Sequence, residues 1–358
     1  MTAAALVSAV VPMVVPALLS TLEPSAGQPP VPAPRASLEP SLENLRAAAA
    51  IVHAAMPPTP QYRWPLLEAA LDGGQASQLW VKHENHTPAG AFKIRGGLVY
   101  FERLRQRQTL PAGVVSATRG NHGQSVGFAA QRLGLPALIV VPVGNSREKN
   151  AAMRALGVEL VEHGGDFQAA REHAAGLATA RGWDMVPSFH ADLVAGVASY
   201  ALELFDAVGS LHTVYVPIGL GSGACGLIAA RNALGLTTEI VGVVCAGAPA
   251  YALSLARGEP VSHAVTTELA DGMACRTPEP EALRLLQKGL ARVVLVSDKE
   301  VALAMRRLYE CTHQVAEGAG AAACAALWQE RASQRGRRSA VILSGGNVDR
   351  DVYARVLS

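Results

Sequence analysis

Cysteine is scarce in this 358-residue sequence, and the way it is spaced excludes two common uses. The five cysteines are odd in number, lie far apart and form no C-x-x-C pair: Cys225, Cys245, Cys275, Cys311 and Cys324. This pattern argues against a disulfide framework and against a zinc cluster. We therefore expect a protein of a reducing compartment, the cytoplasm, without a structural metal ion.

The sequence also lacks a dominant charge. It has 31 basic and 29 acidic residues, a net charge of +2, and no long run of either sign. Such a balance gives no indication of a nucleic acid or an anionic membrane as partner. Half of the residues are hydrophobic, which is enough to bury a sizeable core in a chain of this length. A small molecule is the expected partner.

One long apolar run does occur, at the N-terminus. Residues 1–22 carry no charged side chain, so hydropathy alone allows a signal peptide or a short membrane span. However, no Lys or Arg precedes the run, Pro12 and Pro16 interrupt it, and a proline-rich stretch follows. We predict that residues 1–41 are a disordered leader or follow a start codon placed too early, with a cleaved signal as the less favoured alternative.

From about residue 42, short β-branched runs alternate with alanine-rich amphipathic stretches, which predicts an α/β fold with a parallel sheet. The expected strands are 79–82, 113–117, 137–143, 158–162, 184–189, 213–219, 239–245, 292–297 and 340–346. The expected helices are 122–133, 148–156, 167–181, 193–208, 223–234, 280–288, 298–311 and 319–332.

Lysine is rare, with only five among the 31 basic residues: Lys82, Lys93, Lys149, Lys288 and Lys299. One of them, Lys93, stands among small and apolar residues in ENHTPAGAFKIRG, residues 84–96. An amine in such surroundings loses hydration, its pKa falls, and it can form a Schiff base or act as a general base. The alternative is an ordinary lysine whose amine reaches solvent.

The turn SATRGNHGQS, residues 116–125, lies between an expected strand and an expected helix. Gly120 and Gly123 let the backbone approach a ligand, and amides at the start of a helix bind a carboxylate well. A simple helix cap by Asn121 is the alternative.

Two more turns follow strong strands. GLGSGACG, residues 219–226, is a glycine-rich loop at a helix start, which can cradle a phosphate with backbone amides. From Gly221 it also matches G-x-G-x-x-G, but the next strand ends at Cys245 without the acid that a nicotinamide cofactor requires. SGGN, residues 344–347, places a hydroxyl at the edge of the sheet, although a plain turn explains it equally well.

Together these segments resemble the fold type II pyridoxal phosphate enzymes, within the serine/threonine dehydratase and serine racemase group. ENHTPAGAFKIRGG resembles the lysine motif, RGNHGQS the asparagine loop, PIGLGSGACG the phosphate loop and LSGGNVD the closing serine motif, all in family order. The resemblance implies a tryptophan synthase β-like α/β fold with twisted, mostly parallel sheets. It also implies a large domain of residues 42–109 and 193–358, a small domain of residues 110–192, and a homodimer or homotetramer.

The resemblance also implies roles for individual residues. Lys93 would hold pyridoxal 5'-phosphate as a Schiff base and then remove the Cα proton of the substrate. Phe92 would pack beside the ring, Asn121 would bond the 3'-oxygen and Ser344 would face the ring nitrogen. The phosphate would be held by Gly219, Leu220, Gly221, Ser222 and Gly223. The substrate carboxylate would be held by the loop of Thr118, Arg119, Gly120, Asn121 and His122.

The implied reaction is the elimination of water from threonine or serine, which gives a 2-oxo acid and ammonia. A serine at the ring nitrogen does not stabilise a protonated pyridinium, and this favours quick loss of a β-substituent. Because the chain ends twelve residues after Gly346, we expect no regulatory domain and a catabolic role. The alternatives are a dehydratase for phenylserine or 3-hydroxyaspartate, an amino acid racemase, and a β-replacement synthase.

Departures from the family pattern carry further expectations. Serine racemases of this group have a serine where this chain has Arg119, and arginine is a poor base. Arg119 could instead attract a second substrate carboxylate, with a surface ion pair as the simpler alternative. Metal-activated relatives place acids just after the strand that ends at Cys245, and their lack here predicts no divalent cation site. Three residues that we expect to face the substrate would suit a bulkier or more apolar substrate, such as phenylserine, as well as they would suit threonine: Val197, Ala198 and Met273. Glu317 matches a family glutamate, although an acid at a helix start needs no catalytic reason.

Overall fold

The computed structural model describes residues 37–72 and 77–358. Most of the predicted leader, residues 1–36, lies outside the described residues. The first helix, α1 (Leu42–His53), begins where the leader was predicted to end, because the Ser41 side chain accepts a hydrogen bond from the amide of Asn44 and caps it. Within the described ranges, every helix is too short or too polar to cross a membrane.

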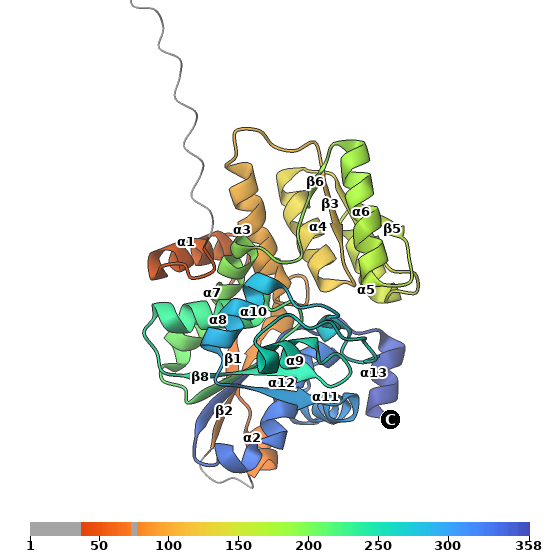
Figure 1. Ribbon diagram of the computed structural model, residues 1–358. Coiled ribbons are helices and arrows are strands. Elements are labelled where there is room, and N and C mark those ends of the chain that lie inside the picture. The colour runs from red at the N-terminus through yellow and green to blue at the C-terminus, as the bar shows by residue number, and fades with distance from the viewer. Residues whose placement is uncertain (1–36, 73–76) are drawn as a thin grey trace, which may run out of the picture. The chain divides into compact units, whose positions relative to one another are not determined.

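The described residues form two sheets covered by helices, which confirms the predicted α/β class (Figure 1). The larger has the order β1-β2-β10-β7-β8-β9, and only β1 runs antiparallel to its neighbour. The smaller has the order β5-β4-β3-β6 and is parallel throughout. The strands of the larger sheet are β1 (Gln61–Arg63), β2 (Gln78–His83), β7 (Thr213–Pro217), β8 (Glu239–Cys245), β9 (Arg292–Val296) and β10 (Arg338–Leu343). Those of the smaller are β3 (Val114–Ala117), β4 (Ala137–Val141), β5 (Glu159–Glu162) and β6 (Asp184–Met185).

Helices cover both faces of each sheet and bury separate hydrophobic clusters. On the larger sheet, α11 (Asp298–Thr312) and α12 (Gly318–Gln329) pack on one face, while α7 (Ala191–Val208), α8 (Ser222–Ala233) and α10 (Pro280–Gly289) pack on the other. On the smaller sheet, α4 (Asn121–Leu133) and α5 (Arg147–Ala155) oppose α6 (Phe167–Arg181). The remaining helices are α2 (Pro65–Asp72), α3 (Lys93–Arg105), α9 (Ala250–Arg257), α13 (Arg350–Leu357) and three short 3-10 turns, η1 (Glu84–His86), η2 (Asp271–Met273) and η3 (Arg331–Gln334).

All nine predicted strands and all eight predicted helices are present, most with ends within two residues, although β6 covers only two residues of its predicted six. The sequence reading missed β1 and the helices α1, α2, α3, α9 and α13. The omission of α3 matters most, because this helix begins at Lys93. Its first turns contain Gly96 and Gly97, which are poor helix formers in isolation.

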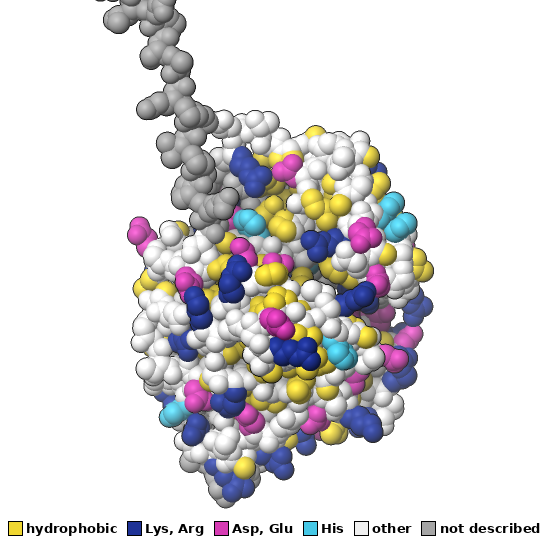
Figure 2. All heavy atoms as spheres, in the orientation of Figure 1, with side chains coloured by type: hydrophobic (Ala, Val, Ile, Leu, Met, Phe, Trp, Pro, Cys, Tyr) yellow, Lys and Arg dark blue, Asp and Glu magenta, His cyan; other side chains and the backbone are white. Residues whose placement is uncertain are grey.

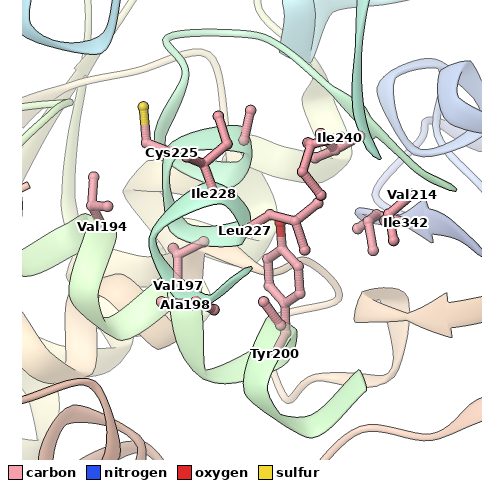
Figure 3. Close-up of a cluster of buried hydrophobic side chains, with 14 of the residues drawn as sticks. Val194, Val197, Ala198, Tyr200, Val214, Cys225, Leu227, Ile228, Ile240 and Ile342 are labelled. Atoms are coloured by element: carbon pink, nitrogen blue, oxygen red, sulfur yellow. The ribbon is translucent and has the colours of Figure 1, made fainter. Parts of the chain in front are cut away.

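Close helix packing explains these glycines. A Cβ on Gly96 would lie 2.8 Å from the carbonyl oxygen of Leu193, and a Cβ on Gly196 would collide with the carbonyl oxygen of Arg95. In the same way, a Cβ on Gly226 of α8 would lie 2.9 Å from the amide nitrogen of Ala198. Figure 3 shows buried side chains from α7 and from α8 that belong to one hydrophobic cluster. Helix α3 is therefore stabilised by tertiary packing rather than by its own propensity.

The smaller sheet is built from residues 114–185, inside the range predicted for a small domain. The division into domains of residues 42–109 with 193–358 and of residues 110–192 stays a prediction. On the face shown in Figure 2, basic and acidic side chains are interspersed rather than gathered by sign.

Candidate active site

Three of the predicted segments meet at one edge of the larger sheet. Strands β2, β10 and β7 are neighbours and run parallel, so their carboxyl ends lie together. The chain leaves β2 toward Lys93, β10 at Ser344, and β7 at the loop of residues 219–223. Ligands of open parallel sheets bind at this edge.

Lys93 is the first residue of α3, and its amine has no hydrogen-bond or ion-pair partner among the described residues. The amine lies 4.9 Å from the centre of the Phe92 ring. Burial lowers the pKa of Lys93 to about 8, although the nearby carboxylate of Glu317 opposes this change. An appreciable fraction of this amine is therefore neutral near neutral pH, as a nucleophile or base requires.

Phe92 joins the lysine segment to the other two. Its amide donates to the carbonyl oxygen of Ser344 at 3.0 Å, and its ring meets the ring of Tyr200 edge-on at 6.3 Å. A Cβ on Gly223 would lie 3.6 Å from the same ring. Ser344 is a buried residue, and its hydroxyl has no partner among the described residues, so it is available to a ligand.

The glycine-rich loop enters α8 with the backbone that an anion site needs. Gly221 has φ +100°, in the left-handed region, and a Cβ on Gly219 would lie 2.5 Å from the carbonyl oxygen of Gly272. The hydroxyl of Tyr251 donates to the carbonyl oxygen of Leu220 at 2.8 Å and holds the loop in place. Because α8 begins at Ser222, its first amides lack partners within the helix and can donate to a phosphate.

The loop before α4 is partly engaged already. The amide of Thr118 donates to Val140 at 3.1 Å, and the amide of Gly120 donates to the hydroxyl of Thr118 at 2.9 Å. A substrate carboxylate would therefore be left with the amides of Arg119, Asn121 and His122.

His122 is buried near Lys93, and its Nε2 atom has no partner among the described residues. Burial, assisted by the charge of Lys93, lowers the pKa of His122 to about 3. The imidazole is therefore neutral at physiological pH and cannot serve as a proton donor in its charged form.

Asn121 is held at both ends of its amide group. Its Nδ2 donates to Glu317 Oε1 at 2.6 Å, and its Oδ1 accepts from Asn347 Nδ2 at 2.9 Å. Asn347 Nδ2 donates its other hydrogen to the carbonyl oxygen of Ala89 at 2.8 Å. The sequence patterns did not predict a role for Asn347, although it is part of the SGGN segment.

Lys149 connects α5 to η2 and to the start of α12, and the sequence patterns did not predict this role. Its amine lies 2.7 Å from Asp271 Oδ2 and 3.2 Å from Glu317 Oε2, and its side chain occupies the space that a Cβ on Gly120 would need. Burial tends to lower the pKa of Lys149, but Glu317 and Asp271 outweigh it and raise the pKa. Burial raises the pKa of Glu317, and Lys149 opposes that effect. Lysine is scarce in the sequence, and this argument was used only for Lys93. The same argument applies to Lys149 and could have identified it as a candidate site residue.

A second buried network fixes the start of α3. Arg95, two residues after Lys93, donates to Glu84 at 2.7 Å and to Glu203 at 2.6 Å, and Arg95 and Glu84 are fully buried. Lys82 lies 2.6 Å from Glu203. Burial would raise the pKa of Glu203, but Arg95 and Lys82 outweigh it and lower the pKa to about 2. The charges of this network therefore balance inside the protein, where an unpaired one would be costly.

Three residues expected to face the substrate contribute to the hydrophobic core. Val197 and Ala198 pack with Leu227 and Ile228 of α8 (Figure 3), and Met273 lies in the cluster under α12. Core packing accounts for their apolar character, so it gives no reason to prefer phenylserine to threonine as the substrate.

The region beyond β8 was expected to lack a cation site. There, Asp298 accepts from the hydroxyl of Thr267 at 2.6 Å and from two backbone amides of residues 268 and 269. The described residues contain no group of three or more His, Cys, Asp or Glu side chains suited to a metal ion.

The donors of this site fit pyridoxal phosphate. An amine without a partner, a loop of helix-start amides and a hydroxyl without a partner come from three segments that meet at Phe92. Asn121 keeps one Nδ2 hydrogen beyond the one given to Glu317, which an oxygen of the ring can accept. These groups match an aldehyde, a phosphate, a ring nitrogen and a ring oxygen.

Comparison with known proteins agrees with this fit. The family described as "Pyridoxal-phosphate dependent enzyme" matches residues 53–345. The L-threonine ammonia-lyase of Geobacter sulfurreducens is 36% identical over 272 residues, 76% of this chain and 67% of that protein. The biosynthetic L-threonine dehydratase IlvA of Escherichia coli K12 is 34% identical over 311 residues, 86% of this chain and 60% of that protein. The chain thus spans about two thirds, or less, of the length of these relatives.

A solved structure shares the fold. The crystal structure of a pyridoxal 5'-phosphate-dependent aspartate racemase has a TM-score of 0.81 and 26% identity, covering 87% of this chain and 97% of that one.

Proposed function

Because the chain belongs to the family of pyridoxal-phosphate dependent enzymes, we propose that it removes water from small β-hydroxy amino acids such as threonine and serine, releasing ammonia and a 2-oxo acid. The observation that carries the proposal is the unpaired amine of Lys93, with its lowered pKa, at the sheet edge shared with the glycine-rich loop. The threonine ammonia-lyase and threonine dehydratase among its relatives support this substrate class.

Each residue has a part in this reaction. The bound cofactor supplies an electron-withdrawing ring that stabilises negative charge on the substrate Cα. Lys93, in its neutral form, takes the Cα proton, and Phe92 keeps the amine in an apolar environment. The first amides of α8 hold the phosphate, and the free amides before α4 hold the substrate carboxylate. Ser344, a neutral side chain, would face the ring nitrogen and would not force it to be protonated.

The test is the release of ammonia and 2-oxo acid from L-threonine and L-serine by the purified holoenzyme. Lys93→Ala should lower kcat by about a thousand-fold or more, whereas Lys299→Ala, at an exposed position on α11, should leave it unchanged. Product that forms only when sulfide is supplied would instead identify a β-replacement synthase.

Arg119 favours a second candidate, a dehydratase for a β-hydroxy amino acid with a second carboxylate, such as 3-hydroxyaspartate. Its side chain makes no ion pair with any described residue, and its Nε atom is buried without a partner. An unsatisfied buried donor costs about 1–3 kcal/mol, which an acidic ligand group would remove. If this is right, Arg119→Met should lower kcat/KM for 3-hydroxyaspartate far more than for threonine. Equal losses on both substrates would refute it.

We also propose a catabolic role in the cytoplasm as a homodimer or homotetramer. All five cysteines are free thiols, as a reducing compartment allows. Exposed apolar side chains surround a cavity of about 330 Å³ lined by Trp64, Pro65, Leu66, Cys311, Thr312 and His313. Leu66 is 65% exposed, and Tyr62, whose ring contacts that of Trp64, is 50% exposed. Such a patch suits contact between subunits, and analytical ultracentrifugation gives the oligomeric state directly.

A further inference from the structure

Asn121 carries a chemically asymmetric side chain whose two ends look alike in shape. An amide group can be turned by half a revolution without steric change, which exchanges its donor and its acceptor. If Asn121 bonds the 3'-oxygen of the cofactor, the orientation of its amide decides whether that oxygen meets a hydrogen or a lone pair.

The neighbours of Asn121 distinguish the two orientations. Asn347 Nδ2, 2.9 Å from Asn121 Oδ1, can only donate, and it is itself fixed by Ala89. Glu317 Oε1, 2.6 Å from Asn121 Nδ2, can only accept while Glu317 is a carboxylate. Lys149 lies 3.2 Å from the other carboxylate oxygen and favours that form. If the amide of Asn121 were turned, its NH2 group would face the NH2 group of Asn347, and its oxygen would face the carboxylate of Glu317. Neither pair can form a hydrogen bond.

The backbone is shaped to allow this arrangement. Gly90 has φ +65°, and a Cβ there would lie 2.5 Å from Asn347 Oδ1. The close approach of Asn347 thus requires glycine at position 90. Glu317 stands just before α12, where its own amide donates to the carbonyl oxygen of Gly345 at 3.1 Å.

We infer that Asn347 and Glu317 are positioning residues that fix the Asn121 amide so that it presents a hydrogen, and not a lone pair, to the 3'-oxygen of the cofactor. The inference rests on the proposed function, since it presupposes that pyridoxal phosphate binds beside Asn121. Neither positioning residue needs to touch the cofactor. Their contribution is to exclude the inverted amide.

The test reverses the network while keeping its charge. In the double variant Asn347→Asp with Glu317→Gln, the new carboxylate at position 347 can only accept and the new amide at position 317 can donate. An inverted Asn121 then satisfies both of its neighbours, whereas the hydrogen bond from position 347 to the carbonyl oxygen of Ala89 is lost. The local net charge equals that of the parent. The single variant Glu317→Gln reports the loss of the ion pair with Lys149, and Asn232→Asp, at an exposed position on α8, controls for the same chemical change elsewhere.

Two measurements on the reconstituted proteins decide the matter: the affinity for pyridoxal 5'-phosphate, and the ratio of the long-wavelength to the short-wavelength absorption band of the bound cofactor. The long-wavelength form carries the negative 3'-oxygen, which a hydrogen from Asn121 stabilises. We expect the double variant to melt somewhat below Glu317→Gln, because the hydrogen bond to Ala89 is lost. It should also bind the cofactor about 10- to 100-fold more weakly and lose long-wavelength absorbance, which a loss of the Ala89 bond alone does not predict. Asn232→Asp should match the parent in both.

A double variant with the same affinity and band ratio as Glu317→Gln alone would overturn the inference. In that case the cofactor would bind equally well whichever way the Asn121 amide is turned. This outcome is distinct from a failure of the proposed function. In that case the parent protein itself would neither bind pyridoxal 5'-phosphate nor release ammonia from β-hydroxy amino acids.

Discussion

The lowered pKa of Lys93 gives the sharpest prediction about the reactivity of this protein. With a pKa of about 8 in place of 10.5, about one amine in ten is neutral at pH 7, roughly 300-fold more than for an ordinary lysine. The rate at which Lys93 reacts with an amine-selective acylating reagent should therefore rise tenfold per pH unit and level off above about pH 8.

The assay uses the cofactor-free protein, a trace of reagent, and mass spectrometry of the peptide that contains Lys93, from about pH 6 to about pH 10. A lysine derivative free in solution provides the reference, and its rate should keep rising over the whole range. A rate for Lys93 that keeps rising up to about pH 10, as that of the free derivative does, would refute the claim that burial controls this amine.

The effect of Glu317 on the pKa of Lys93 gives a second prediction. Burial is the larger influence on Lys93, and the Glu317 carboxylate opposes it by favouring the charged amine. Glu317→Gln removes that opposition, so the inflection should move to lower pH. Movement to higher pH would show that Glu317 acts on Lys93 in some other way.

Three further predictions concern the framework of the site. Arg95→Leu leaves Glu84 buried without its cation and leaves Glu203 with Lys82 as its remaining cation, so it should destabilise the fold by about 3–5 kcal/mol in chemical denaturation. A loss no larger than that of the exposed Arg105→Leu would contradict this. Gly221→Ala and Gly235→Ala both place alanine at positive φ, and each should cost about 1 kcal/mol. Only Gly221→Ala also crowds Ala282 at 2.9 Å and should speed cofactor release, so equal release rates would count against the phosphate loop. The pKa of Glu203 is about 2 in the folded protein and 4.5 in the unfolded chain. Its contribution to the free energy of unfolding is therefore complete above pH 4.5 and is lost as the pH falls toward 2. A Glu203→Gln variant whose free energy of unfolding falls as steeply as the parent's between these pH values would disprove this.

What the sequence by itself determined are the features that depend on neighbours along the chain. Alternation of strand and helix patterns predicted the α/β class, and glycine spacing at 219–226 predicted a helix-start anion loop, because both follow from local backbone geometry. The four motifs led to the right family, since each is a short contiguous segment.

Tertiary structure alone decided the features that join distant segments. Asn121 meets Glu317 from 196 residues away and Asn347 from 226 residues away, so no local pattern fixes the direction of its amide. Helix α3 forms in spite of the glycines in its first turns, because α7 packs closely on it. The pKa of Lys93 likewise depends on burial by segments far along the chain, since desolvation is a property of the folded surroundings and not of the neighbouring residues.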